Sequence, residues 1–135
     1  MLRAISSMRF QLNVYGAPWA ANNAADVRCF VEAAWTAGHD IARVFFFFDG
    51  VYHGLLSQSP ASDEANPLAY WQSLALADVD LLLCIAAASN RGVLDEAESR
   101  RYQQSLTTSA PCFELTGLGQ WAAGFHDVDR IITFK

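Results

Sequence analysis

The sequence feature that most constrains the fold is a nearly unbroken apolar run at residues 41–48. It reads Ile-Ala-Arg-Val-Phe-Phe-Phe-Phe, and the turn residues Asp49 and Gly50 follow it. A half-buried antiparallel strand alternates apolar and polar residues, whereas a parallel strand covered on both faces reads as a continuous apolar run. Residues 41–48 are therefore predicted to form an inner strand of a parallel sheet.

Strand and helix patterns alternate along the rest of the chain. The other predicted strands are residues 8–15 and 79–85, with weaker candidates at 113–116 and 131–134. Predicted helices begin at Asn22 or Asn23, at Asn66-Pro67 and at Asp95, and a short helix lies near residues 120–125. This alternation predicts a three-layer α/β/α domain with a mainly parallel sheet of about five strands.

The length and composition fit one domain with its own core, since 53% of the 135 residues are hydrophobic. We expect this domain to span residues 8–135, after a flexible extension at residues 1–7 that lacks the apolar segment of a signal peptide. No run of about eighteen apolar residues occurs, so we expect no membrane span. Three scattered cysteines make no disulfide framework and favour a reducing, cytoplasmic compartment.

The charge balance disfavours direct binding to nucleic acid. Nine Lys and Arg residues against fourteen Asp and Glu residues give a net charge of −5, whereas a protein that contacts phosphates is expected to be basic. Charged residues make up 17% of the chain and aromatic residues 13%. Because aromatic residues are enriched at interfaces, we expect an oligomer that works with partner proteins.

Candidate chemistry lies where the predicted strands end, because ligands of open α/β sheets bind at the carboxyl edge. Cys84 ends the strand at 79–85, and a helical turn at 86–89 would direct backbone N–H groups toward its thiol and favour the thiolate. Arg91 is a candidate to stabilise that thiolate, and Tyr52 and His53 are candidates to line the pocket. Alternatively, Cys84 is a small buried hydrophobe, and its position alone leaves both interpretations open.

The other cysteines and histidines are weaker candidates. Cys29 is predicted on the outer face of its helix, and Cys112 lies in a loop as an incidental thiol or a resolving partner for Cys84. His39 is predicted to be structural at the amino edge of the sheet, and His126 to be a surface residue. We find no C-x-x-C spacing and no phosphate-binding loop, and we expect neither a metal nor a nucleotide cofactor.

Four segments, taken together and in order, resemble the DsrE/DsrF-like sulfurtransferases. They are Val-Phe-Phe-Phe-Phe-Asp-Gly-Val-Tyr at 44–52, Ser-Pro-Ala-Ser-Asp-Glu at 59–64, Cys-Ile-Ala-Ala-Ala at 84–88 with Arg-Gly-Val at 91–93, and Thr-Gly-Leu-Gly at 116–119 before Asp129-Arg130. The resemblance covers nearly the whole chain from Met8 onward. The sequence departs from the family pattern at residues 16–19 and at Ser89-Asn90.

The resemblance implies that Cys84 accepts sulfur as a persulfide and relays it to a cysteine of an acceptor protein, in the pathway of tRNA wobble-uridine 2-thiolation. It also implies a persulfide donor protein and assembly with homologous small subunits into a heterohexamer, a dimer of heterotrimers. One alternative is a DsrE-like subunit of dissimilatory sulfur oxidation. Another is a non-catalytic assembly subunit in which Cys84 is buried.

Overall fold

The computed structural model describes residues 6–20 and 22–135, so most of the predicted N-terminal extension lies outside the described residues. Five strands form one sheet, in which each neighbouring pair is parallel and the order is β4-β3-β2-β1-β5. The strands are β1 (Arg9–Val14), β2 (Asp40–Phe46), β3 (Asp80–Cys84), β4 (Glu114–Thr116) and β5 (Arg130–Phe134). The predicted α/β class is confirmed, and each of the five predicted strands is present.

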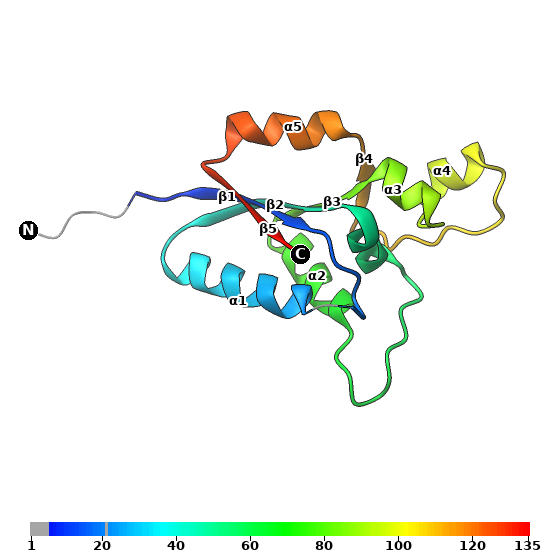
Figure 1. Cartoon of the computed structure of the whole chain (residues 1–135), viewed down its shortest axis with the longest axis horizontal. Helices are drawn as coiled ribbons and strands as arrows, with labels where there is room; N and C mark the ends of the chain where they lie inside the picture. The colour runs from blue at the N-terminus through cyan, green and yellow to red at the C-terminus, as the bar shows by residue number, and fades with distance from the viewer. Residues whose placement is uncertain (1–5, 21) are drawn as a thin grey trace, which may run out of the picture.

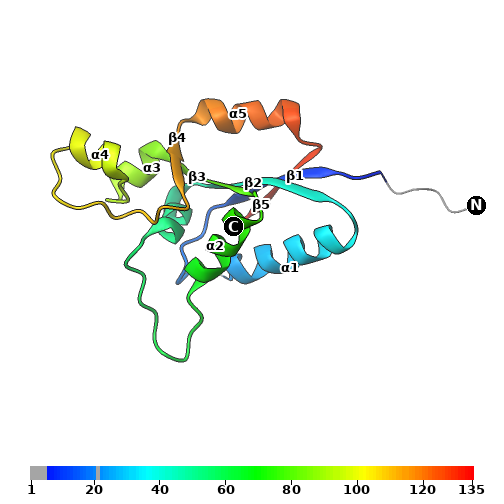
Figure 2. The same cartoon turned by 180° about the vertical axis from the view of Figure 1, so that it is seen from behind.

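Helices cover both faces of this sheet. They are α1 (Asn23–Thr36), α2 (Pro67–Leu76), α3 (Ile85–Asn90), α4 (Glu96–Arg101) and α5 (Leu118–Asp127), with a 3₁₀ helix η1 (Phe48–Gly54). Figure 1 shows α1 and α2 on one side of the sheet and α5 on the other, and Figure 2 shows the same layers from behind. Right-handed crossovers explain the division, because the chain moves across the sheet one way from β1 to β4 and returns to reach β5. Among the described residues, no helix is long and apolar enough to cross a membrane.

The inner strand β2 is covered on both faces, as its apolar run predicts. Phe46 is fully buried, and its ring lies 5.1 Å, centroid to centroid, from that of Trp71 in α2. Phe45, also fully buried, stacks on Phe47 at 4.6 Å on the opposite face. Phe47 in turn meets Trp121 of α5 at 5.9 Å. Aromatic side chains thus join the sheet to both helical layers.

The predicted strand at 41–48 extends too far, because β2 ends at Phe46. Phe48 has a φ of 48° and begins η1, so the chain leaves the sheet at this point. Gly50 then packs against β1, where an added Cβ would lie 2.1 Å from the carbonyl oxygen of Val14. A side chain at this position would displace the turn, which is why a glycine stands here.

Two of the predicted helix starts are capped by side chains. Asn66 accepts a hydrogen bond from the backbone N–H of Leu68 at the start of α2, and Asp95 caps α4 in the same way. Asn22 is the N-cap of α1, but within the described residues its side chain makes no capping hydrogen bond. Asn23 is buried and accepts a hydrogen bond from the N–H of Gly16, so it fixes the loop after β1.

The sheet face beneath α5 carries buried polar side chains. Gln11 is buried and donates to Asn13 Oδ1 at 3.3 Å, and it accepts a hydrogen bond from Arg43 at 3.1 Å. Arg43 also binds both carboxylate oxygens of Asp127 in α5. Gly124 lets α5 approach closely, since an added Cβ would lie 2.0 Å from Gln11 Oε1. Polar contacts and one close approach therefore fix α5 on the sheet.

Candidate active site

Cys84 lies where β3 ends and α3 begins. It is the last residue of β3 and the N-cap of α3, and 8% of its surface is exposed. Backbone N–H groups in the first turn of a helix lack partners within the helix, and they are available to an acceptor at this end. The helical turn predicted after Cys84 is present as the start of α3, and it begins at Ile85.

The strand register places Cys84 on the face of the sheet that α5 covers. Side chains alternate along a strand, so Cys84 shares a face with Leu82, whose ladder partner is Phe45 on the α5 side. In the other direction, Cys84 pairs with Thr116 of the edge strand β4. The Thr116 hydroxyl lies 2.7 Å from Oε1 of Gln120 in α5. The neighbour of Cys84 in β4 therefore bears a hydroxyl group.

Arg91 is the C-cap residue of α3, at the opposite end of that helix from Cys84. Its Nε donates to Asp49 Oδ1 at 2.9 Å, and its Nη1 donates to the carbonyl oxygen of Ala87 at 3.1 Å. The charge predicted to stabilise the thiolate is thus paired with a carboxylate. These contacts join the end of α3 to η1, which follows β2.

His53 lies in the core rather than in the wall of a pocket, contrary to the sequence prediction. Its ring is fully buried, with Nε2 3.0 Å from the carbonyl oxygen of Gly16 and Nδ1 3.2 Å from Nε1 of Trp71. An indole nitrogen only donates, so Nδ1 accepts and Nε2 carries the proton given to Gly16. Burial lowers the pKa of His53 to about 4, which leaves the ring neutral.

Tyr52, the other predicted pocket residue, is half-buried in η1. Its ring centroid lies 5.0 Å from that of Trp19, which is 68% exposed. The pair joins the loop after β1 to η1 at the carboxyl edge. The role of Tyr52 as a pocket residue stays a prediction.

The remaining cysteines lie away from the strand end that carries Cys84. Cys29 is exposed on α1, on the outer face that its helical position predicts. Cys112 is half-buried in the turn before β4, whereas Cys84 is level with Thr116 at the end of that strand. Burial raises the pKa of the Cys112 thiol. A resolving role for Cys112 thus has little support from its position.

The other two histidines occupy the predicted kinds of position. Nδ1 of His39 accepts a hydrogen bond from the N–H of Met8 at 3.0 Å, at the amino edge of the sheet. His126 is exposed near the end of α5. Within residues 6–20 and 22–135, no three His, Cys, Asp or Glu side chains gather as a metal ion would require.

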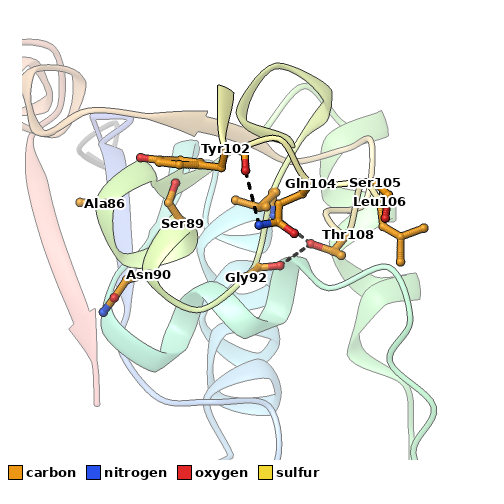
Figure 3. A pocket seen from close by; sticks show the side chains of 10 residues that line it. Ala86, Ser89, Asn90, Gly92, Tyr102, Gln104, Ser105, Leu106 and Thr108 are labelled. Atoms are coloured by element: carbon orange, nitrogen blue, oxygen red, sulfur yellow. Dashed lines mark hydrogen bonds between the residues drawn. The ribbon is translucent and has the colours of Figure 1, made fainter. Parts of the chain in front are cut away.

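A cavity of about 830 Å³ opens beside α3. Figure 3 shows Ala86, Ser89 and Asn90 along the helix, with Tyr102 and Gln104 contributed by the segment after α4. Ala86 is the lining residue nearest to Cys84 in the chain, but residues two positions apart in a helix are roughly 200° apart around the axis, and Cys84 itself does not line the cavity. The lining is largely neutral, with hydroxyl and amide groups among apolar side chains.

Thr116 and Gln120 are site residues that our sequence reasoning did not identify. Their relation to Cys84 depends on the pairing of β3 with β4, which joins residues more than thirty positions apart. The Thr-Gly-Leu-Gly segment at 116–119 was the available signal, and it indicated a family resemblance without a contact.

The geometry defines an α/β domain with a cysteine at the carboxyl edge of a parallel sheet. The family model described as "DsrE/DsrF-like family" matches residues 8–134, and the chain belongs to this family. It is 38% identical over 128 residues to proteins named "Sulfurtransferase TusD" from Salmonella newport (strain SL254) and Salmonella typhi. Each match covers 94% of this chain and 100% of the relative.

The fold also resembles a solved structure. The crystal structure of the ychN protein from E. coli matches with a TM-score of 0.74, covering 94% of this chain and 99% of that one. At 21% sequence identity this likeness concerns the fold alone.

Proposed function

We propose that this chain is a sulfurtransferase that accepts sulfur as a persulfide on Cys84 and passes it to a cysteine of an acceptor protein. The position of Cys84 carries the proposal, since its thiol lies at the carboxyl edge of the sheet and at the first turn of a helix. The similarity to the Salmonella sulfurtransferases over nearly the whole chain supports the same chemistry.

In the loading step, the Cys84 thiolate attacks the outer sulfur of a donor persulfide, R–S–SH. A sulfur–sulfur bond forms at Cys84 while the donor's sulfur–sulfur bond breaks, and the donor leaves as the thiolate R–S⁻. The products are R–S⁻ and Cys84–S–SH, so one sulfane sulfur has moved. The exchange is balanced and needs no external oxidant or reductant.

In the unloading step, the thiolate of an acceptor cysteine attacks the outer sulfur held by Cys84. The sulfur–sulfur bond at Cys84 breaks, and Cys84 leaves as a thiolate that is ready for another cycle. Cys84 is therefore the nucleophile in one step and the leaving group in the next. A residue that stabilises its negative charge assists both steps.

The surrounding residues fit these roles. The N–H groups of the first turn of α3 favour negative charge on the sulfur, and the packing around Leu82 and Phe45 limits the access of water. Arg91 fixes the far end of α3 through Asp49, and through this contact it helps to hold the thiol in place.

We further propose that the pathway is tRNA wobble-uridine 2-thiolation, in the cytoplasm, and that the chain assembles with homologous small subunits into a heterohexamer. The net charge of −5 supports sulfur exchange with proteins rather than direct contact with tRNA. The family resemblance implies this pathway, and the Salmonella relatives are named as sulfurtransferases.

Cysteine-to-serine variants test the sulfur-accepting role of Cys84. The Cys29→Ser/Cys112→Ser variant retains Cys84, and Cys84→Ser is the matched loss-of-function variant. Each is incubated with glutathione persulfide, and peptides are analysed by mass spectrometry without reduction. We expect rapid addition of one sulfur atom on the Cys84 peptide, and at most slow loading of Cys29 or Cys112 in Cys84→Ser. Faster loading of Cys112 in Cys84→Ser than of Cys84 in the double variant, or a Cys84 that takes up no sulfur in the folded protein, would overturn the proposal.

A further inference from the structure

Cys84 has two neighbours at its own level in the sheet. Thr116 is its ladder partner in β4. On the other side, Phe46 pairs with Leu83, and the extended residue Phe47 continues β2 beside β1 through a hydrogen bond from its N–H to Val14. Of the two neighbours, Phe47 presents an aromatic ring, whereas Thr116 presents a hydroxyl that can donate a hydrogen bond.

The distance between the paired strands β3 and β4 suits a hydrogen bond between the side chains of Thr116 and Cys84. Neighbouring strands lie about 4.8 Å apart, and side chains paired in register project from the same face. The hydroxyl of Thr116 and the thiol of Cys84 are each one bond beyond their Cβ atoms, so rotation about χ1 can turn the hydroxyl, which contacts Gln120 in this structure, toward the sulfur. Thr116 is half-buried on the edge strand, where its side chain has room to rotate.

Gln120 controls where the hydroxyl hydrogen points. Its Oε1 lies 2.7 Å from the Thr116 oxygen and accepts that hydrogen. A half-turn of the exposed amide presents Nε2 instead, which donates to the same oxygen and leaves the hydroxyl hydrogen free for another acceptor. The Gln120 side chain can thus release the hydroxyl toward β3 without losing its own contact.

We propose that Thr116 is a positioning residue that donates a hydrogen bond from its hydroxyl to the sulfur of Cys84. The inference rests on the proposed function of Cys84 and deepens it. Before loading, the bond stabilises the attacking thiolate and fixes its direction. During unloading, the same bond stabilises the charge that returns to Cys84 when the sulfur–sulfur bond breaks.

The test uses the Cys29→Ser/Cys112→Ser chain, in which Cys84 is the remaining thiol. Thr116→Val keeps the shape of the side chain and removes the hydroxyl, Thr116→Ser restores it, and Thr107→Val makes the same change at an exposed loop position. The rate of alkylation by iodoacetamide is measured across pH, and the rate of unloading is measured with a small thiol as acceptor.

We expect Thr116→Val to move the midpoint of the alkylation profile to higher pH by about one unit, since a hydrogen bond to a charged group is lost. At a pH below the midpoint the rate falls roughly tenfold, because less thiolate is present, and unloading slows as well. Thr116→Ser is expected to recover the original profile, and Thr107→Val to leave it unchanged.

A Thr116→Val profile that coincides with the parent profile, in a chain that still loads sulfur, would overturn the role of Thr116 and leave the proposed function intact. An alkylation midpoint that is shifted in Thr116→Ser as well as in Thr116→Val also contradicts the proposed hydrogen bond. Packing rather than the hydroxyl would then be responsible for the shift. If the parent chain fails to load sulfur while the Thr116→Val profile shifts, the relay fails and the hydrogen bond stands.

Discussion

Nε1 of Trp71 donates a hydrogen bond to Nδ1 of His53 across 3.2 Å, in a part of the core that solvent does not reach. The ring is neutral there, because burial lowers the pKa of His53 from 6.5 to about 4. In the unfolded chain the ring takes up a proton near pH 6.5, whereas the folded ring does so near pH 4. The free energy of unfolding is therefore expected to fall by roughly 3 kcal/mol between those two values, and to be insensitive to His53 at higher pH.

Urea unfolding at a series of pH values measures this dependence. His53→Gln is expected to lose this pH dependence of the unfolding free energy and to be less stable at neutral pH by about 1–3 kcal/mol, because a flexible amide does not hold the Trp71 donor and the Gly16 carbonyl in the geometry of the ring. His126→Gln, on the exposed surface, is the matched control and keeps the slope. A slope that survives in His53→Gln would show that other groups cause it.

The close approach of α5 to Gln11 predicts opposite effects for two glycines of one helix. At Gly124 an added Cβ would lie 2.0 Å from Gln11 Oε1 and 3.1 Å from Nη1 of Arg43, whereas no described atom lies within 4 Å of a Cβ added at Gly119. We expect Gly124→Ala to destabilise the fold by about 1–3 kcal/mol. Gly119→Ala is expected to be neutral or stabilising by up to about 1 kcal/mol. Thermal unfolding compares them, and a Gly124→Ala Tm at or above the parent value would contradict the packing.

The two cysteines outside the site are expected to differ in reactivity. Burial raises the pKa of the Cys112 thiol, so at a given pH less of it is thiolate, while Cys29 is exposed on α1. In the Cys84→Ser variant, iodoacetamide should therefore modify Cys29 several times faster than Cys112 near neutral pH. Peptide mass spectrometry over a time course measures both rates in one sample. Faster modification of Cys112 would show that its surroundings activate it.

The contacts of Arg91 predict that, for the loading of Cys84, the shape of its side chain matters more than its charge. A lysine keeps the charge but cannot bind Asp49 and the Ala87 carbonyl through two nitrogens at once. We expect Arg91→Lys and Arg91→Met to slow the loading of Cys84 by a similar factor, roughly tenfold, because α3 is then held less firmly. Arg100→Met, in an exposed pair on α4, is the control. A lysine variant that loads at the parent rate would instead support direct stabilisation of the thiolate by charge.

The sequence predicts much of this fold because its signals are local. The apolar run at 41–48 predicts an inner strand, where both of its faces are covered. Asn66 and Asp95 are N-cap residues, and they mark the starts of their helices. The same run misled the prediction at its end, since Phe47 and Phe48 are as apolar as the residues before them. The chain leaves the sheet there because Gly50 meets the backbone of Val14, a contact between distant segments.

The residues of the candidate site also differ in whether local sequence or contacts between distant segments determine their positions. Cys84 is a candidate from its place at the end of an apolar run, a property of adjacent residues, and the family resemblance favours it over a purely buried role. The burial of His53 depends on Gly16 and Trp71, which approach it from two other elements. The relation of Thr116 to Cys84 likewise depends on strand register, which a single sequence does not reveal.

The strand order also has a consequence for how the protein is made. β1 is the first strand to be synthesised and β5 the last, yet they are neighbours, with Asn13 and Thr133 paired across 120 positions. On the ribosome, one side of β1 has no native neighbour until residues 130–134 have emerged. During that interval its free backbone groups can pair with a strand of another nascent chain. Cells that make this protein quickly are therefore expected to depend on chaperones that shield the first strand until the last one arrives.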